Sequence, residues 1–324
     1  MKKYKISETD MRVSRIGYGC MGIGGRWDST ALTLDEKSAA VRAVGAAFEQ
    51  GITFYDHADI YASGKSEIVF SEALKQISGL REKITIQSKC GIRFQGDPGP
   101  DSPMRYDFSY EHIMNSVNGS LKRLNTDVID VLLLHRSDPL IEPEEVAKAF
   151  DELHQAGKVR YFGVSNFNAG QIALLQSYLD HPLVVNQLEL NLLHSHLIND
   201  GIITNQLEGP YSSSAGVLDY CRLNNILIQA WGPVARGRLI NPPVDAKDNV
   251  KNVAGLIADY AEKKETSIEA IVLAWLLKHP AGIQPIIGTT NVERIAASCK
   301  ADEIDLSREE WFCLFNAARG NPVP

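Results

Sequence analysis

The sequence predicts an α/β fold in which eight parallel strands close into a (β/α)8 TIM barrel. Short apolar runs with strand character alternate with amphipathic helical stretches along the chain. The pattern contains eight expected strands, and no Ser-, Pro- or Gly-rich linker and no change in composition divides them. We therefore expect residues 1–324 to form a single barrel domain.

The expected strands are short apolar runs, mostly bounded by polar or turn-forming residues. They cover residues 16–19, 53–56, 84–88, 128–134, 159–164, 184–187, 226–230 and 285–287. Helical spacing of apolar residues follows in 34–50, 66–77, 110–124, 142–156, 168–178 and 267–278. Pro143 stands at the start of one helix and Gly157 just after its end, as helix termini favour.

Three segments lie outside this repeat. We expect residues 3–15 to form a hairpin that caps the bottom of the barrel, and the residues after Ser307 to form an extra C-terminal helix. Residues 91–108 are longer than a typical connection after a strand. Because long loops of this kind usually border the substrate, this loop is expected near the active site.

Composition and charge narrow the classes of function. A formal net charge of -7 without any Lys/Arg run argues against a nucleic-acid partner. The N-terminus lacks the apolar stretch of a signal peptide, and no run approaches the ~20 apolar residues that span a bilayer. The five cysteines include no CxxC pair, so neither a disulfide framework nor a structural zinc site is indicated. We expect a cytoplasmic protein that binds a small molecule and has no membrane partner.

Four polar residues stand at or just after the ends of neighbouring strands, where barrel enzymes place their catalytic groups. Asp56 and Tyr61 occur in GITFYDHADIY, Lys89 in QSKCG and His135 in LLLHR. A phenol has a pKa of ~10, and a nearby ammonium lowers it. We expect Lys89 to bring the pKa of Tyr61 toward neutrality and Asp56 to keep Lys89 charged. A neutral His135 would position a substrate oxygen.

These motifs, together with GVSNF, resemble the signatures of the aldo-keto reductase superfamily and follow one another in the family's order. The resemblance runs from Gly17 to about Arg294. SKCG and LHQAGKVRYFGVSNF are similar to the bacterial branch related to potassium-channel β subunits. The resemblance implies reduction of a small aldehyde or ketone with a nicotinamide cofactor. It also implies a catalytic tetrad with Tyr61 as the general acid, and its members are Tyr61, Lys89, Asp56 and His135.

The resemblance further implies a set of cofactor contacts along the mouth of the barrel. Ser165, Asn166 and Gln187 match positions that hydrogen-bond the nicotinamide carboxamide, and Trp231 matches the aromatic residue that stacks on the ring. The loop 232–238 is expected to contact the pyrophosphate, because it carries two arginines and two glycines after the seventh strand. The remaining implied contacts are Gly19, Cys20, Met21, Asp56, Gly232, Pro233, Val234, Ala235, Arg236, Gly237, Arg238, Gly288, Thr289, Arg294 and Ser298.

Two positions depart from the classical family pattern. A lysine of that pattern is replaced here by Gly288, and an asparagine that contacts adenine is replaced by Ser298. Arg294 matches the arginine near the 2′-phosphate and can pair with that group by itself. We expect NADPH as the cofactor, with NADH as the alternative.

Three other interpretations lead to different functions. Residues 17–22 spell GxGxxG, but a dinucleotide-binding motif should open a helix, and residues 23–29 lack helical periodicity. The histidines and acids of DHAD and HSH would suit a metal-dependent hydrolase, although Lys89 places a positive charge among those ligands. A cofactor-binding regulatory subunit with little turnover is the third, and the intact tetrad argues against it. We expect no metal and a monomer.

Overall fold

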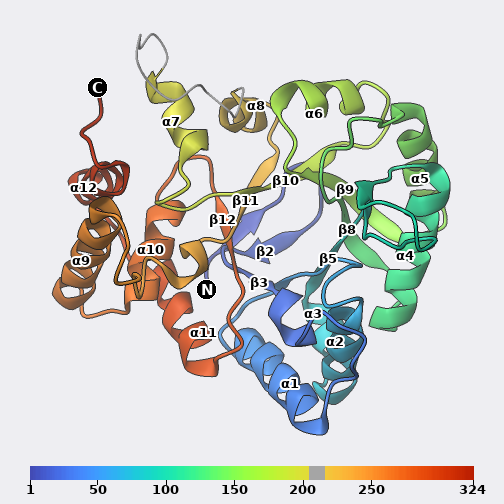
Figure 1. Cartoon of the computed structure of the whole chain (residues 1–324), viewed down its shortest axis with the longest axis horizontal. Helices are drawn as coiled ribbons and strands as arrows, with labels where there is room; N and C mark the ends of the chain where they lie inside the picture. The colour runs from blue at the N-terminus through green and yellow to red at the C-terminus, as the bar shows by residue number, and fades with distance from the viewer. Residues whose placement is uncertain (204–215) are drawn as a thin grey trace.

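The strands predicted from the apolar runs all occur, each within two residues of its expected bounds. They are β3 (Gly17–Gly19), β4 (Phe54–Asp56), β5 (Thr85–Cys90), β8 (Ile129–Leu134), β9 (Val159–Ser165), β10 (Leu183–Glu189), β11 (Leu227–Trp231) and β12 (Gln284–Ile287). In the computed structural model, which describes residues 1–203 and 216–324, they form a closed barrel in the order β10-β11-β12-β3-β4-β5-β8-β9. Every neighbouring pair is parallel, and helices surround the barrel (Figure 1). The predicted single-domain (β/α)8 fold is confirmed.

The six helices predicted from periodicity are present as well. They are α1 (Leu34–Glu49), α2 (Lys65–Gln76), α4 (Tyr110–Leu124), α5 (Pro143–Gln155), α6 (Ala169–Gln176) and α10 (Ile268–Leu277). Thr33 and Asn168 begin two of them with reciprocal capping boxes. The helices that were not predicted are α3 (Leu80–Lys83), α7 (His196–Ile203), α8 (Val217–Leu223), α9 (Asp248–Lys263) and α11 (Val292–Cys299). Most of these are short, and α9 begins without a side-chain cap.

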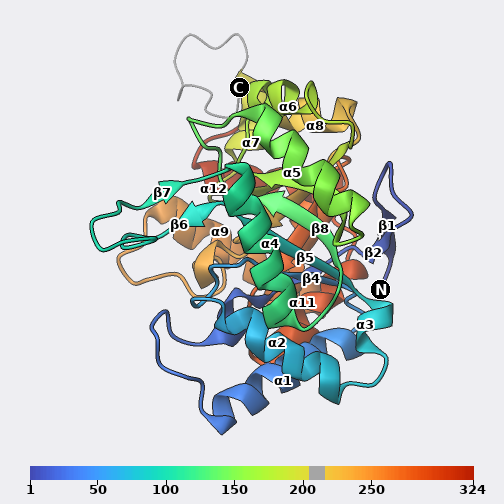
Figure 2. The same cartoon turned by 90° about the vertical axis from the view of Figure 1, so that its right-hand side faces the viewer.

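A different hairpin lies at each end of the barrel. The hairpin of β1 (Lys3–Lys5) and β2 (Arg12–Ser14) packs Ile6, Met11 and Val13 against the interior residues Phe54 and Val131, which confirms the predicted bottom cap. Residues 91–108 form a second hairpin from β6 (Ile92–Arg93) and β7 (Arg105–Tyr106). Figure 2 shows the two hairpins at opposite ends of the barrel. The second hairpin therefore stands at the mouth, where the strands end.

The C-terminal part of the chain covers one side of the barrel. The predicted extra helix is α12 (Arg308–Arg319), and its Trp311 ring stacks on Trp275 of α10 with centroids 5.1 Å apart. Three short 3-10 helices complete the described structure: η1 (Cys20–Gly24), η2 (Ala235–Gly237) and η3 (Lys300–Asp302). Within the described ranges, no helix combines the length and apolar character needed to cross a membrane.

Candidate active site

The carboxyl ends of β4, β5 and β8 bring together the four residues predicted from the strand ends. Lys89 Nζ lies 2.7 Å from Asp56 Oδ1 and donates a hydrogen bond of 2.9 Å to the Tyr61 hydroxyl. His135 follows β8, and its ring meets the Tyr61 ring edge to face with centroids 5.8 Å apart. The four side chains thus form one contiguous cluster at the mouth of the barrel.

Lys89 is buried, with 1% of its surface exposed. A buried ammonium is tolerated only when each of its protons finds an acceptor. Besides Asp56 and Tyr61, the third acceptor is the backbone oxygen of His57, at 2.9 Å. All three Lys89 donors are therefore used within the cluster, so the orientation of the ammonium is fixed.

Burial and charge act in opposite directions on Lys89 and Tyr61. Burial lowers the pKa of Lys89, but Asp56 and Tyr61 outweigh it and hold this pKa above its ordinary value. Burial raises the pKa of Tyr61, and Lys89 offsets this effect only in part. The prediction that Lys89 brings the pKa of Tyr61 toward neutrality is therefore wrong for the free protein. Tyr61 is protonated at neutral pH, which is the form that can donate a proton.

His135 is neutral at neutral pH, as predicted. Burial moves its pKa well below the ordinary range, and the positive charges of Lys89 and Arg136 add to the effect. A neutral imidazole carries one N–H donor and one acceptor nitrogen. His135 can therefore hydrogen-bond a carbonyl oxygen without bringing another positive charge beside Lys89.

A cavity of about 620 Å³ connects this cluster with the loops after β11 and β12. It contains most of the residues that the sequence predicted for the tetrad and the cofactor. The predicted residues in its lining are Gly19, Met21, Asp56, Tyr61, His135, Ser165, Asn166, Gln187, Trp231, Gly232, Pro233, Val234, Arg236, Gly237, Gly288, Thr289 and Arg294.

The side chains expected at the nicotinamide are held by one another. Asn166 Nδ2 donates to Ser165 Oγ at 2.8 Å, and Ser165 Oγ donates to the Gln187 backbone oxygen at 2.9 Å. Trp231 Nε1 donates to Asn166 Oδ1 at 3.1 Å. This part of the cavity is therefore rigid, and its indole and amide groups suit a flat ring that carries a carboxamide.

The two arginines at the far part of the cavity differ in their partners. Arg294 is exposed, and its Nε lies 3.1 Å from Glu269 Oε1. Arg236 is also exposed and takes a left-handed backbone conformation with φ of 57°. Among the described residues, no carboxylate lies within ion-pair distance of Arg236. Arg236 is therefore the freer of the two to bind an anionic group.

Four predicted cofactor residues lie outside the lining of this cavity: Cys20, Ala235, Arg238 and Ser298. Cys20 is fully buried, with its Sγ 3.8 Å from the Tyr18 backbone oxygen, and Ser298 is buried on α11. Ala235 is buried, and the Arg238 side chain is exposed to solvent. The structure gives these four no contact with the cavity.

Three lining residues were not predicted: Gly22, Arg136 and Ile286. Arg136 directly follows His135 in LLLHR, so its position after a strand end was a signal that could have identified it. Its guanidinium lies 5.7 Å from the centre of the Trp231 ring, within the range of a cation–π contact. Arg136 therefore adds a positive charge beside the expected nicotinamide position.

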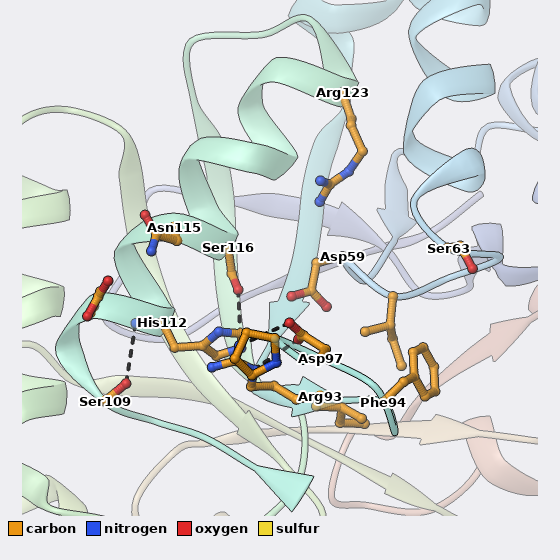
Figure 3. A pocket seen from close by; sticks show the side chains of 14 residues that line it. Asp59, Ser63, Arg93, Phe94, Asp97, Ser109, His112, Asn115, Ser116 and Arg123 are labelled. Atoms are coloured by element: carbon orange, nitrogen blue, oxygen red, sulfur yellow. Dashed lines mark hydrogen bonds and ion pairs between the residues drawn. The ribbon is translucent and has the colours of Figure 1, made fainter. Parts of the chain in front are cut away.

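A second cavity, of about 790 Å³, is lined in part by Asp59, Ile60 and Ser63, which flank Tyr61 in the chain (Figure 3). Asp59 points into it, opposite Arg93 and His112 of the neighbouring elements. Burial raises the pKa of Asp59 to about 7, and the carboxylate of Glu67 adds to this shift.

The acids and histidine of the DHAD segment therefore do not converge as a metal-dependent hydrolase would require. Asp56 binds Lys89, Asp59 lines the second cavity, and the His57 ring packs edge to face against Phe70 with centroids 4.4 Å apart. In the part of the chain that the structure describes, no three His, Cys, Asp or Glu side chains are grouped to hold a metal ion.

The fold is an α/β barrel with a buried, hydrogen-bonded polar cluster at its mouth. The model of the aldo/keto reductase family matches residues 15–314. The chain therefore belongs to the aldo/keto reductase family.

Similar proteins carry oxidoreductase names. The chain is 40% identical to oxidoreductase YdhF of Escherichia coli, over 85% of each chain. It is 37% identical to the uncharacterized oxidoreductase YcsN of Bacillus subtilis and 35% identical to a 6-dehydroglucose reductase of Agrobacterium fabrum. Both of these matches cover 100% of each chain. The family and these relatives together identify the chain as an oxidoreductase.

Solved structures share the fold. An aldo-keto reductase from Bacillus halodurans, described as a holo form, has 25% identity and a TM-score of 0.74, over 99% of this chain and 96% of that one. The glycerol dehydrogenase of Gluconobacter oxydans has 24% identity and a TM-score of 0.83, over 100% and 97%. The second likeness supports the barrel fold alone.

Proposed function

We propose that this protein reduces a small aldehyde or ketone to the alcohol, with NADPH as its preferred cofactor and Tyr61 as the proton donor. The observation that carries the proposal is the 2.9 Å hydrogen bond from buried Lys89 to the Tyr61 hydroxyl. Tyr61 lines a cavity that also contains the residues expected to bind a nicotinamide nucleotide. Membership of the aldo/keto reductase family, whose members generally use NAD(P)H, supports the same reaction.

The chemistry of the cavity fits a dinucleotide. Trp231 and the side-chain amides of Asn166 and Gln187 suit the nicotinamide, and Arg236 suits a phosphate. Gly288 and Thr289 precede the N-terminus of α11, where backbone N–H groups favour a bound anion. When bound, the reduced nicotinamide supplies the hydride to the carbonyl carbon.

Tyr61 completes the reduction on the oxygen side. The carbonyl oxygen gains electron density as the hydride arrives, and it takes the proton from the Tyr61 hydroxyl as that O–H bond breaks. The phenolate left on Tyr61 is stabilised by Lys89, which already donates a hydrogen bond to that oxygen. Asp56 balances the charge of Lys89, and a proton from solvent restores Tyr61 after the alcohol leaves.

His135 and Arg136 have different tasks near the carbonyl. His135 is neutral and lies edge to face with Tyr61, so it can donate a hydrogen bond to the same oxygen and orient it. Arg136 lines the same cavity as His135 and lies over the Trp231 ring. Its charge favours substrates that carry oxygen atoms beside the carbonyl.

The preference for NADPH depends on the two arginines of the outer cavity. Arg294 matches the family position near the 2′-phosphate, but it shares its charge with Glu269. Arg236 has no such competitor within the described chain. We infer that both arginines face the phosphates and that Glu269 reduces the contribution of Arg294 to NADPH selectivity.

The substrate lies in the open part of the mouth beside Tyr61. Trp27 packs edge to face against both Tyr61 and Phe94, with centroids 6.4 and 6.2 Å apart. Trp27 and Phe94 are exposed to solvent in part, which suits an apolar wall beside the reacting carbonyl. Two relatives, at 35% and 34% identity, are named 6-dehydroglucose reductase, so sugar-derived aldehydes are candidate substrates.

A panel of aldehydes and ketones tests the proposal directly. The absorbance of the reduced nicotinamide is followed with NADPH and with NADH, and carbonyl-dependent consumption that is faster with NADPH is expected. Cofactor binding without turnover of any carbonyl would instead indicate the regulatory subunit. A stoichiometric metal ion in the purified protein, without cofactor binding, would indicate the hydrolase.

A further inference from the structure

Four buried glutamines run through the interior of the barrel. Gln187, Gln229 and Gln284 lie side by side on β10, β11 and β12, at paired positions of the strand register. Gln87 lies on β5, which stands opposite β11 in the closed barrel. Each of the four is at most 2% exposed. Branched apolar side chains usually fill this space in such barrels, so a layer of amides requires an explanation.

The four amides are joined by hydrogen bonds into one network. Gln87 Nε2 and Gln187 Nε2 both donate to Gln229 Oε1, at 2.8 and 2.9 Å. Gln229 Nε2 donates to Gln284 Oε1 at 2.9 Å. Because β5 and β11 face each other, the bond between Gln87 and Gln229 crosses the barrel. We call these four residues the glutamine relay.

The orientation of every amide in the relay is fixed from two ends. At one end, Gln284 Nε2 donates to the backbone oxygen of Ser14, which can only accept. At the other end, Gln87 Nε2 donates at 2.6 Å to Asp56 Oδ1, and an ionised carboxylate also only accepts. Both ends therefore require Gln229 to accept hydrogen bonds through Oε1 and to donate one to Gln284 through Nε2.

Two consequences follow at the mouth of the barrel. Asp56 receives a hydrogen bond from Gln87 on the same oxygen that lies 2.7 Å from Lys89, so the carboxylate cannot rotate freely. Gln187 uses its Nε2 toward Gln229, which leaves its Oε1 for the cavity that it lines. An oxygen in this place accepts an N–H, as the amide nitrogen of a carboxamide would provide.

The relay keeps this orientation although one atom is left without a partner. Gln87 Oε1 is buried and accepts no hydrogen bond within the described residues. A rotated Gln87 amide would direct its oxygen at the Asp56 carboxylate and would lose the bond to Gln229. Unsatisfied buried groups are uncommon and are typical of positions kept for function.

We propose that Gln87 and Gln229 are positioning residues, which hold the Asp56 carboxylate on one side of the barrel and the Gln187 amide on the other in a fixed relation. This inference rests on the proposed function, because it takes Asp56 as the partner of Lys89 in proton donation by Tyr61, and Gln187 as a contact of the cofactor. The relay thus connects Asp56, beside the proton-donating Tyr61, with Gln187, beside the expected nicotinamide, through the interior of the barrel.

Kinetics of Gln87→Leu and Gln229→Leu test the proposal through the separation of kcat from KM. Gln87→Leu should lower kcat about tenfold to hundredfold, because Asp56 loses a donor, and should change the KM for NADPH by less than about threefold. Gln229 contacts both Gln87 and Gln187. The Gln229→Leu variant should therefore lower kcat and also raise the KM for NADPH. Equal effects of the two variants on both constants would contradict this assignment.

Gln176→Leu is the matched control. Gln176 lies at the opposite end of the barrel, where its amide bonds His181 O at 3.1 Å and Leu183 N at 2.8 Å. This variant loses two hydrogen bonds and should keep the kcat and KM of the wild type. If the relay variants behaved like Gln176→Leu at a similar loss of stability, the positioning role would be refuted.

A second measurement does not depend on turnover. Urea denaturation of Gln87→Leu, Gln229→Leu and the double variant gives a thermodynamic cycle. The relay predicts that the double variant loses less stability than the sum of the two single losses, and additive losses would refute the bond across the barrel. A wild-type protein that turned over no carbonyl would refute the proposed function, while this cycle would still decide whether the relay exists.

Discussion

Replacement of Lys89 by Met tests the core of the site with a magnitude that follows from its contacts. Met matches the length of the Lys stem but removes the ammonium, which bonds Asp56, Tyr61 and the His57 backbone at 2.7 to 2.9 Å. Asp56 is only 3% exposed, so its carboxylate is left buried without a cation. Breaking a buried ion pair in this way costs about 3–5 kcal/mol of unfolding free energy.

The same substitution removes the charge that stabilises the Tyr61 phenolate, so kcat should fall about 10²–10⁴-fold. The assays are urea denaturation and carbonyl reduction at saturating NADPH, under conditions where the variant is folded. The double variant Asp56→Asn/Lys89→Met removes both charges and should recover much of the lost stability without recovering kcat. A single variant with near-normal kcat, or a double variant that recovers kcat, would refute the reasoning.

Three further predictions concern acid stability and the cofactor. Burial lowers the pKa of His57 to about 3 from 6.5. As the pH falls below 7, His57 therefore binds a proton in the unfolded chain but not in the folded one, which destabilises the fold. The wild type should therefore lose about 2 kcal/mol more between pH 7 and pH 5 than His57→Leu in urea denaturation, and equal losses would contradict this. Arg236→Ala should raise the KM for NADPH about tenfold to hundredfold, because a charge-assisted contact to phosphate is lost; an unchanged KM would exclude Arg236 from the phosphates. Glu269→Gln should lower the KM for NADPH and leave that for NADH unchanged, because it releases Arg294; a parallel change with both cofactors would count against a 2′-phosphate contact.

Features encoded by short segments could be predicted from the sequence. Each strand is marked by its own apolar run, and the barrel places every strand end at one mouth, so Asp56, Lys89 and His135 could be expected together before any distance was known. The same logic pointed to the loop after the seventh strand, whereas Trp231 was implied by the resemblance to the family. Arg136 was missed although it stands in LLLHR directly after His135, because only His135 of that motif was assigned a role.

Features that depend on packing between distant segments could not be predicted. The pKa of Tyr61 is set by burial as well as by Lys89, and burial depends on the whole mouth of the barrel. The pairing of Arg294 with Glu269 joins two helices, and the bond between Gln87 and Gln229 joins opposite strands. Such contacts follow from the closed barrel and leave no local pattern in the chain.

The central claim is that the Tyr61 hydroxyl gives the proton that completes carbonyl reduction. Tyr61→Phe keeps the ring that packs against Trp27 and His135 and removes only the hydroxyl. The direct test is the single-turnover rate of this variant at saturating NADPH, with the Kd for NADPH measured on the same sample. We predict an unchanged Kd and a rate about 10²–10⁴-fold below that of the wild type. A rate close to that of the wild type, with NADPH bound, would contradict the claim.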